Sequence, residues 1–255
     1  MSAARTDPVA ATAISAVLLD VGGVITTPDH SMMRTALESV GVDASTAALD
    51  RAHYAGVAAL DGEFLTEGSL DWRQYDAAVA RSVGVPSDRV GEAVEALERA
   101  WRLVRGWHRI VPGALEGLRL LAETGVPLGV VSNADGTVAD QLVAARVCQV
   151  GAGHGVEMAV VIDSTVVGFE KPDPRIFGFA LSALGALGVP EQGVVHVGDT
   201  IFADVFGARA AGLRPLHLDP YGDCRGAPGD HEHVRSLAEV AALVRAGQAG
   251  LGVTL

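Results

Sequence analysis

A chain of 255 residues can bury about three-quarters of the surface of its unfolded form, which predicts one large or two modest domains. The composition, with 49% hydrophobic and 20% charged residues, excludes a disordered or fibrous protein. The formal net charge of -12 argues against a nucleic-acid partner, because no surplus of basic side chains can displace counterions from phosphates.

The compartment follows from the cysteines and from the hydropathy of the chain. Two cysteines, Cys148 and Cys224, are too few for a disulfide framework and fit a reducing compartment. No uncharged apolar stretch reaches the roughly 18 residues of a membrane span. The apolar run after Arg5 reaches Asp20 without a signal-peptide cleavage site. We therefore expect a soluble, cytoplasmic protein with no membrane partner, and the oligomeric state stays open.

The first half of the chain predicts one strand followed by helices. Residues 1–13, like residues 249–255, are expected to be flexible. An apolar run over residues 16–19 stops at Asp20 and a glycine pair, as a buried strand ending in a tight turn does. Helical periodicity then covers residues 31–40, 45–60, 69–83 and 87–104, each beginning near a capping residue. We expect residues 30–105 to form an all-helical insertion.

The second half predicts alternating helices and strands. The expected helices cover residues 112–123, 174–187, 203–211 and 234–246, and the expected strands cover residues 126–131, 158–162, 194–197 and 215–218. Such alternation is typical of a parallel sheet with helices on both faces. We therefore predict a Rossmann-like α/β core made of residues 14–29 and 106–248.

Polar side chains follow several of these strands at the point where each strand ends. They are Asp20, Ser132 with Asn133, and Asp199 with Asp204, and Lys171 follows a further strand. Because ligands of open parallel sheets bind at the carboxyl ends of the strands, we expect these side chains to share one crevice. Three carboxylates beside one ammonium need a cation, and Mg²⁺ is the usual one where phosphate is also bound. Helix capping does not account for four strands at once.

Two residue types occur once in the chain. Lys171 is the single lysine among 19 basic residues, and Asn133 is the single asparagine. In a sequence that otherwise uses arginine, a retained lysine indicates a tight site that admits a compact ammonium and not a planar guanidinium.

These residues resemble the motifs of the haloacid dehalogenase superfamily of hydrolases, most of which are phosphatases. The resemblance covers about residues 14–247 and consists of four motifs in the family's order: Asp20-Val21-Gly22-Gly23-Val24-Ile25, Val130-Val131-Ser132-Asn133, Glu170-Lys171-Pro172-Asp173-Pro174, and Gly198-Asp199-Thr200 with Asp204. Each motif is weak alone, and the four together are specific. The helical insertion is similar to the cap of many members, which implies hinges near residues 26–30 and 105–112.

The resemblance implies a phosphatase that acts on a small phosphorylated metabolite. Asp20 would attack phosphorus to give an aspartyl phosphate, and Lys171 would place a positive charge beside the nucleophile and the phosphate. Mg²⁺ would be bound by Asp20, the backbone carbonyl of Gly22 and Asp199, while Asp204 would hold metal-bound water.

The phosphate contacts follow from the same resemblance. Ser132 would donate a hydrogen bond to a phosphoryl oxygen, and backbone amides of Asn133 and of the turn containing Gly23 would form an anion nest. Gly23 is equally well explained as a turn glycine.

Position 22 departs from the family pattern. Phosphatases of the family usually carry a second Asp here, which protonates the leaving alcohol, whereas this chain has Gly22. A backbone carbonyl can still bind the metal, but proton transfer cannot use this position. General acid–base catalysis is worth about 10²–10⁴-fold, so its loss predicts slow turnover. Asp29, His30 and His53 are candidate replacements, and each is better explained as a packed or exposed residue.

The missing carboxylate leaves two alternatives open. A carbon–halogen hydrolase of the 2-haloacid dehalogenase type also lacks this Asp and needs no metal, with Arg34 as the nearby arginine. Against it, Asp199 and Asp204 resemble a metal-binding pair. The other alternative is a protein that keeps the fold and the metal but binds ligands with weak or no turnover.

Several other residues are assigned structural roles. Aromatic residues in or beside the insertion are expected to pack in the cap core, although they are also placed to line a pocket: Tyr54, Phe64, Trp72, Tyr75, Trp101 and Trp107. His196 and His217 flank strand ends and are expected to be structural. Cys224, His231 and His233 follow no standard zinc spacing and belong to a segment, 221–233, that we expect to be a mobile loop. We therefore expect no metal site there.

Overall fold

The computed structural model describes residues 13–103, 106–227 and 229–250, so the termini expected to be flexible lie mostly outside the described residues. The strands are β1 (Ala16–Leu19), β2 (Thr26–Thr27), β3 (Arg109–Ile110), β4 (Leu128–Ser132), β5 (Cys148–Val150), β6 (Val156–Met158), β7 (Val160–Asp163), β8 (Val194–Gly198), β9 (Arg214–Leu218) and β10 (Glu232–Val234). The α-helices are α1 (His30–Glu38), α2 (Thr46–Glu67), α3 (Trp72–Ser82), α4 (Val90–Leu103), α5 (Ala114–Ala122), α6 (Val138–Ala144), α7 (Ser164–Val167), α8 (Arg175–Ala186), α9 (Phe206–Ala210) and α10 (Leu237–Gly250). Short helical turns are η1 (Ser87–Arg89), η2 (Glu191–Gly193) and η3 (Ile201–Val205), the last of which is π-helical.

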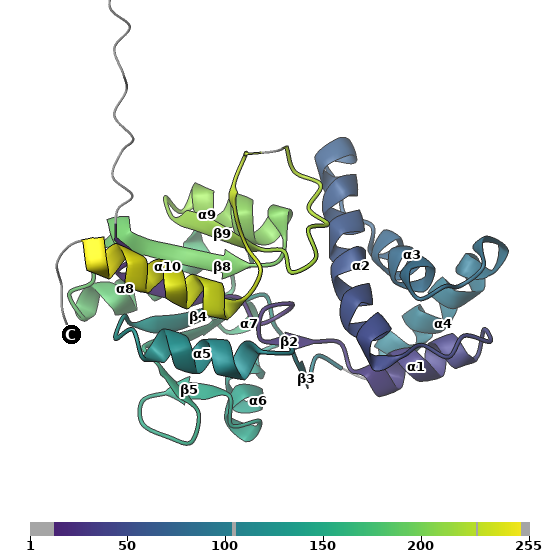
Figure 1. Cartoon of the computed structure of the whole chain (residues 1–255), viewed down its shortest axis with the longest axis horizontal. Helices are drawn as coiled ribbons and strands as arrows, with labels where there is room; N and C mark the ends of the chain where they lie inside the picture. Colours follow the sequence, from purple (N-terminus) through teal and green to yellow (C-terminus); the bar gives the residue numbers. More distant parts are fainter. Residues whose placement is uncertain (1–12, 104–105, 228, 251–255) are drawn as a thin grey trace, which may run out of the picture.

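A parallel sheet of six strands, in the order β10-β9-β8-β1-β4-β7, lies at the centre of the larger part of the molecule (Figure 1). All four residues of β1 are buried, which explains why its sequence is continuously apolar. Buried side chains of α5, α6 and α10 share one core with the sheet, and those of α8 and α9 share another. The predicted α/β class with a parallel sheet is confirmed.

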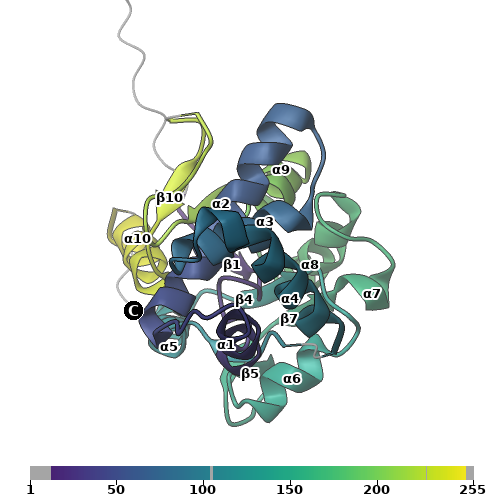
Figure 2. The same ribbon diagram turned by 90° about the vertical axis from the view of Figure 1, so that its right-hand side faces the viewer.

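Helices α1–α4 form a separate layer beyond the carboxyl ends of the strands (Figures 1 and 2). Their apolar side chains, including Met33, Leu49, Val79 and Leu97, pack into a core of their own. At the junction, β2 pairs antiparallel with β3. The all-helical insertion predicted as part of the fold is therefore present, while its boundaries at residues 30 and 105 and the two hinges stay predictions.

The differences from the predicted elements fall on short segments. The strand expected over residues 158–162 is divided into β6 and β7, and the helix expected over residues 203–211 begins as the π-helical turn η3. Helix α6 was not expected. Residues 232–234, expected at or before a helix start, form β10, which pairs with β9 at the edge of the sheet. A three-residue strand has too few positions for a periodic pattern, so only its pairing partner defines it.

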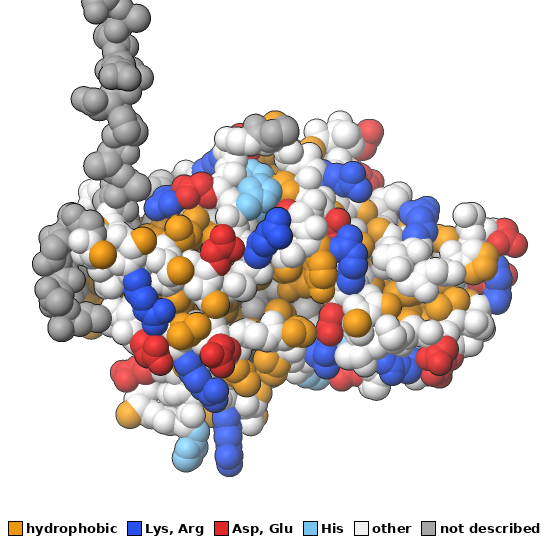
Figure 3. Space-filling model, in the orientation of Figure 1, with side chains coloured by type: hydrophobic (Ala, Val, Ile, Leu, Met, Phe, Trp, Pro, Cys, Tyr) orange, Lys and Arg blue, Asp and Glu red, His pale blue; other side chains and the backbone are white. Residues whose placement is uncertain are grey.

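The hydropathy of the helices and the charges on one face of the surface can be compared with the composition. Among the described residues, the longest helices are too short or too polar to cross a membrane. On the face drawn in Figure 3, acidic and basic side chains are interspersed and form no continuous basic stripe.

Candidate active site

Three carboxylates and one ammonium meet at the carboxyl ends of the central strands. Lys171 Nζ lies 2.9 Å from Oδ1 of Asp20 and 2.6 Å from Oδ1 of Asp204. One oxygen each of Asp20, Asp199 and Asp204 lies within 4.8 Å of the others. All four side chains are buried. Residues from three distant parts of the sequence, around positions 20, 171 and 199–204, thus share one enclosed site.

Strand order explains this convergence. Asp20 directly follows β1 and Asp199 directly follows β8, and these two strands are neighbours in register. Asp204 belongs to η3, and its carboxylate reaches the same point by passing close to Gly198. A Cβ on Gly198 would lie only 2.0 Å from the carboxyl carbon of Asp204. Glycine at position 198 therefore leaves the space that the Asp204 carboxylate occupies.

Asp204 is the most fully bonded of the three carboxylates. Its Oδ1 lies 2.8 Å from Nε2 of His196, and its Oδ2 accepts hydrogen bonds from the hydroxyl of Thr200 at 2.6 Å and from its amide at 3.1 Å. Burial acts to raise the pKa of Asp204, but the Lys171 ammonium and His196 outweigh it and hold the pKa below its usual value. His196, expected to be structural, thus keeps this carboxylate charged.

Asp20 and Asp199 are in the opposite electrostatic situation. Burial raises the pKa of Asp20 to about 6, with Lys171 opposing the shift, and burial together with Asp204 raises the pKa of Asp199 well above its usual value. Asp20 Oδ1 is buried, and its contact with the ammonium lacks hydrogen-bond geometry. The site is therefore short of positive charge.

This deficit tests whether the residues fit Mg²⁺. Three clustered carboxylates offer the hard oxygen ligands that Mg²⁺ prefers, and a bound divalent cation would favour their charged forms. The donor set therefore fits the implied ion.

Helix α2 contributes two side chains for which the sequence analysis favoured a packed or exposed position over a role at the site. Tyr54, expected in the cap core, donates a hydrogen bond from its hydroxyl to the carbonyl oxygen of Gly23 at 2.7 Å. His53 Nε2 lies 3.0 Å from Oδ2 of Asp199, and its Nδ1 lies 3.0 Å from the hydroxyl of Tyr75. Burial lowers the pKa of His53 to about 3, so the ring is neutral. With Asp199 charged, Nε2–H donates to the carboxylate and Nδ1 accepts from Tyr75.

Gly23 is required by this close packing. Its φ of +64° lies in the left-handed region, and a Cβ there would lie 1.8 Å from Oδ2 of Asp199. This geometry supports the interpretation of Gly23 as a turn glycine that also lets Asp199 approach the loop.

Of the predicted phosphate ligands, Asn133 contacts Lys171. The Asn133 side chain binds both backbone groups of Lys171, accepting from its amide at 2.7 Å and donating to its carbonyl at 2.9 Å. Ser132 is buried at the end of β4, opposite Asp163 of β7. The single asparagine thus anchors the single lysine, while the anion contact of its backbone amide stays a prediction.

The ring of Trp107 lies over position 22. A Cβ on Gly22 would lie 3.3 Å from the Trp107 ring and 3.9 Å from Oδ2 of Asp20. Trp107, expected in the cap core, is therefore at the site. Trp72 is also outside that core, being 59% exposed, while Tyr75 and Trp101 belong to it as expected.

The three candidate replacements for the missing acid lie in different places. Asp29 is the N-cap of α1 and accepts from the amide of Ser31 at 2.7 Å, and His30 Nε2 lies 3.2 Å from a carboxylate oxygen of Asp50. These are the packed roles that the sequence analysis favoured. Of these three residues, His53 contacts the group of carboxylates formed by Asp20, Asp199 and Asp204, through Asp199.

The side chains around Cys224, where the sequence analysis expected no metal site, lie close together. Ligand atoms of His217, Cys224, His231 and His233 lie within 4.8 Å of one another. The sequence spacing did not indicate this group because the pairing of β10 with β9 brings His233 beside His217.

The sequence of this chain is similar to known hydrolases. A profile of haloacid dehalogenase-like hydrolases matches residues 14–212. The chain belongs to this family. Phosphoserine phosphatase of Thermus thermophilus is 34% identical to this haloacid dehalogenase-like protein over 152 residues, which are 60% of this chain and 55% of the relative. Ribulose-1,5-bisphosphate 5-phosphatase of Halopiger xanaduensis is 31% identical over 134 residues, which are 52% of each protein.

The alignments span about half the length of these curated relatives. Among solved structures, the magnesium-bound HAD-hydrolase YfnB of Bacillus subtilis superposes with a TM-score of 0.56 at 17% identity. That match covers 91% of this chain and 99% of YfnB, so the haloacid dehalogenase-like fold extends over nearly the whole chain.

Proposed function

We propose that this protein is a Mg²⁺-dependent, cytoplasmic phosphatase that cleaves a small phosphorylated metabolite through an aspartyl phosphate on Asp20. The observation that carries the proposal is the contact of Lys171 with both Asp20 and Asp204, beside a third buried carboxylate, Asp199. Phosphatase activity in the names of two relatives supports the same reaction class. The negative net charge and the absence of a basic stripe on the face in Figure 3 favour a small substrate over a nucleic acid.

Asp20 and Lys171 have different roles in the proposed reaction. An oxygen of Asp20 forms a bond to phosphorus while the bond from phosphorus to the ester oxygen breaks, and the leaving oxygen departs with the bonding electron pair and takes a proton from solvent. Water then attacks the aspartyl phosphate and releases inorganic phosphate, which restores the Asp20 carboxylate. Lys171 offsets the repulsion between carboxylate and phosphate. Mg²⁺, bound by Asp20, the Gly22 carbonyl and Asp199, would supply further positive charge at the phosphoryl oxygens.

Gly22 limits the substrates that this site cleaves quickly. Since glycine offers no proton to the departing oxygen, the first step depends on how well the leaving group carries negative charge. We therefore expect aryl and acyl phosphates, whose leaving groups are weakly basic, to react faster than alkyl phosphates.

Substrate entry requires α2 to move away from the core. Tyr54 and His53 bond directly to Gly23 and Asp199, so this helix covers the carboxylates in the closed arrangement. Opening about the proposed hinges near residues 26–30 and 105–112 would break these two contacts and admit the phosphate.

The glycine at position 22 is also compatible with a second candidate function, that of a 2-haloacid dehalogenase-type hydrolase. Displacement of halide needs no proton, and Arg34 on α1 would be the arginine available for the halide. The buried carboxylates of Asp199 and Asp204 oppose this function, because together with Asp20 they form a group able to hold a metal ion, which a 2-haloacid dehalogenase does not need. Chloride release from a 2-haloacid without metal would favour it.

The test is phosphate release from a panel of phosphorylated metabolites and aryl phosphates, with and without Mg²⁺. Asp20→Asn keeps the shape but removes the nucleophile, and we expect a loss of at least about 10³-fold in kcat/KM. Asp88→Asn, at an exposed position, is the matched control and retains activity.

Equal rates in Asp20→Asn and the parent would remove Asp20 from the nucleophile role. Calorimetric titration with Mg²⁺ measures metal binding independently of phosphate release. Mg²⁺ binding without hydrolysis of any ester would favour a ligand-binding protein.

A further inference from the structure

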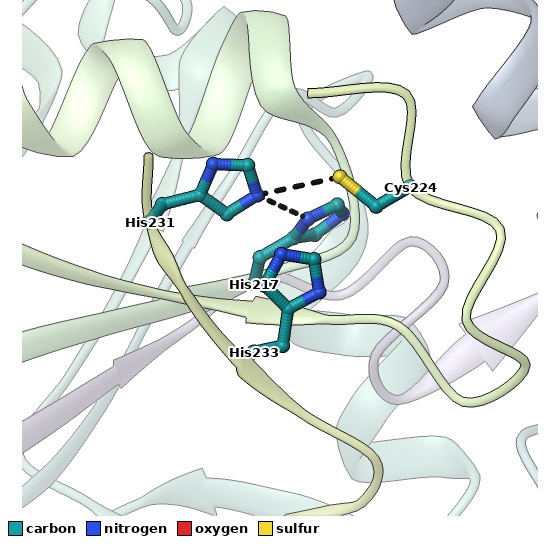
Figure 4. A group of neighbouring side chains, drawn as sticks. All are labelled: His217, Cys224, His231 and His233. Atoms are coloured by element: carbon teal, nitrogen blue, oxygen red, sulfur yellow. Dashed lines mark hydrogen bonds between the residues drawn. The ribbon is translucent and has the colours of Figure 1, made fainter. Parts of the chain in front are cut away.

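A second group of side chains able to bind a metal lies beside the backbone of Asp199, which His217 contacts. His217 belongs to β9, and Cys224 lies in the segment that follows this strand. His231 is the residue before β10, and His233 belongs to β10 (Figure 4). The register of the two strands pairs His233 with His217. All four ligand atoms lie within 4.8 Å of one another, so one ion could contact them all.

The distances within the group approach those of a tetrahedral zinc site. His217 Nδ1 lies 2.9 Å from His231 Nε2, which in turn lies 3.5 Å from Cys224 Sγ. Zinc bond lengths to nitrogen and sulfur imply roughly 3.3–3.6 Å between ligand atoms, so shifts of a few tenths of an ångström suffice for these pairs. Imidazole and thiolate ligands favour Zn²⁺ and disfavour Mg²⁺, which separates this group from the carboxylates.

Each imidazole has an outer partner that turns its other nitrogen toward the group. His217 Nε2 donates to the backbone oxygen of Asp199 at 2.9 Å. His231 Nδ1 lies 3.3 Å from an oxygen of Asp230, and His233 Nδ1 lies 3.4 Å from an oxygen of Asp219. Carbonyl and carboxylate partners of this kind fix the tautomer of zinc-binding histidines.

The loop that presents Cys224 is ordered by the same outer residues. Asp219 accepts hydrogen bonds from the amides of Asp223 and Cys224, at 2.9 and 3.2 Å. The amide of Gly226 donates to Cys224 Sγ at 3.3 Å. Asp219 therefore both orients His233 and holds the thiol in place.

Accessibility suits an ion that enters from solvent. The imidazoles of His217 and His231 are buried, whereas 41% of the His233 side chain is exposed. Histidine atoms are visible at the surface in Figure 3, over the yellow-green part of the ribbon that precedes α10 in Figure 1.

We propose that His217, Cys224, His231 and His233 form a structural Zn²⁺ site. Four protein ligands close the coordination sphere, which is typical of structural zinc, and binding releases the Cys224 proton. The proposal does not depend on the proposed phosphatase activity.

The ion would connect the two parts of the molecule. The segment that carries Cys224 also contacts α2, since Asp223 Oδ1 lies 2.9 Å from Nη2 of Arg51 and the rings of Tyr221 and Tyr54 are 5.5 Å apart. On its other side, His217 supports the backbone of Asp199. Zinc would therefore fix a loop that joins the candidate active site to the helical insertion.

The first experiment measures zinc affinity on protein without a histidine tag, stripped with a chelator and titrated with Zn²⁺ against a chromophoric competitor. We expect one zinc per chain and at least about 100-fold weaker binding in Cys224→Ser and in His231→Ala. Asp219→Asn, which removes an outer partner, should weaken binding about 10–100-fold. His154→Ala, at an exposed histidine elsewhere, and Asp20→Asn, at the carboxylate group, should leave the affinity unchanged.

The second experiment replaces zinc by Co²⁺ and records the thiolate-to-cobalt charge-transfer absorption. We expect this absorption in the parent and in Cys148→Ala, and not in Cys224→Ser. Absence of the absorption in the parent would overturn the proposal even if a variant did not fold. Zinc bound equally well by the parent, Cys224→Ser and His231→Ala would overturn it too.

Discussion

Replacing Lys171 by methionine tests the electrostatic argument for the site. Each of its two contacts, at 2.9 and 2.6 Å, corresponds to about 6 kcal/mol of Coulombic attraction at an effective dielectric constant near 20. Desolvation of the ammonium offsets much of this, and removal of one partner from a buried ion pair costs about 3–5 kcal/mol. For a chain of this size we therefore expect Lys171→Met to lower Tm by roughly 6–20 °C at pH 8.

The decrease in Tm caused by Lys171→Met should be larger at high pH than at low pH. Without the ammonium, the pKa of Asp20 rises further above its present value of about 6. A carboxyl whose pKa is higher in the folded state than in the unfolded state contributes stability below its unfolded pKa. That contribution is lost as the pH rises through the folded pKa. The Tm difference between parent and Lys171→Met should thus be smaller near pH 5 than at pH 8. The part of the difference that comes from the contact with Asp204, whose pKa lies below its usual value, should persist at both pH values. Mg²⁺ should reduce the Tm difference, because the ion binds the folded carboxylates.

Thermal unfolding by circular dichroism at several pH values measures these differences. Arg99→Met is the matched control, because the pair of Arg99 with Glu95 is exposed on both sides and contributes about 0.5 kcal/mol or less. The electrostatic reasoning fails if Lys171→Met has the same deficit at pH 5 and pH 8, or one no larger than that of Arg99→Met.

Three further substitutions address other contacts. Gly22→Asp should raise kcat for alkyl phosphates by up to about 10²-fold over Gly22→Ala, measured across leaving groups of different pKa; equal rates would mean that protonation is not the slow step. Asp61→Ala removes the acceptor for the amides of Ile201 and Phe202, at 2.8 and 3.2 Å. It should cost about 1–3 kcal/mol in urea unfolding, and recovery by Asp61→Asn would identify the hydrogen bonds as the cause. Gly23→Ala should abolish phosphate release, whereas Gly68→Ala, with a φ of +69° but open space around it, should affect stability alone; an active Gly23→Ala would contradict the close packing.

The sequence by itself determined the α/β core and the residues at its strand ends. Continuously apolar runs such as that of β1 are the direct signature of a strand buried on both faces, and the position at which a parallel strand ends fixes where its next side chain lies. The predicted convergence of Asp20, Lys171 and Asp199 rested on this rule. The single lysine and the single asparagine added a compositional signal, and in the structure Asn133 binds the backbone of Lys171.

Tertiary packing alone decided the contacts between elements that are not neighbours in the sheet. Periodicity identified a helix around residues 45–60 but not which of its residues meet the core, so His53 and Tyr54 could not be assigned to the site before α2 was docked. Likewise, β10 is too short to carry a pattern, and its pairing with β9 brings His233 to His217. Local sequence encodes which face of an element is apolar. The partner of that face is set by long-range packing, which has no local signature.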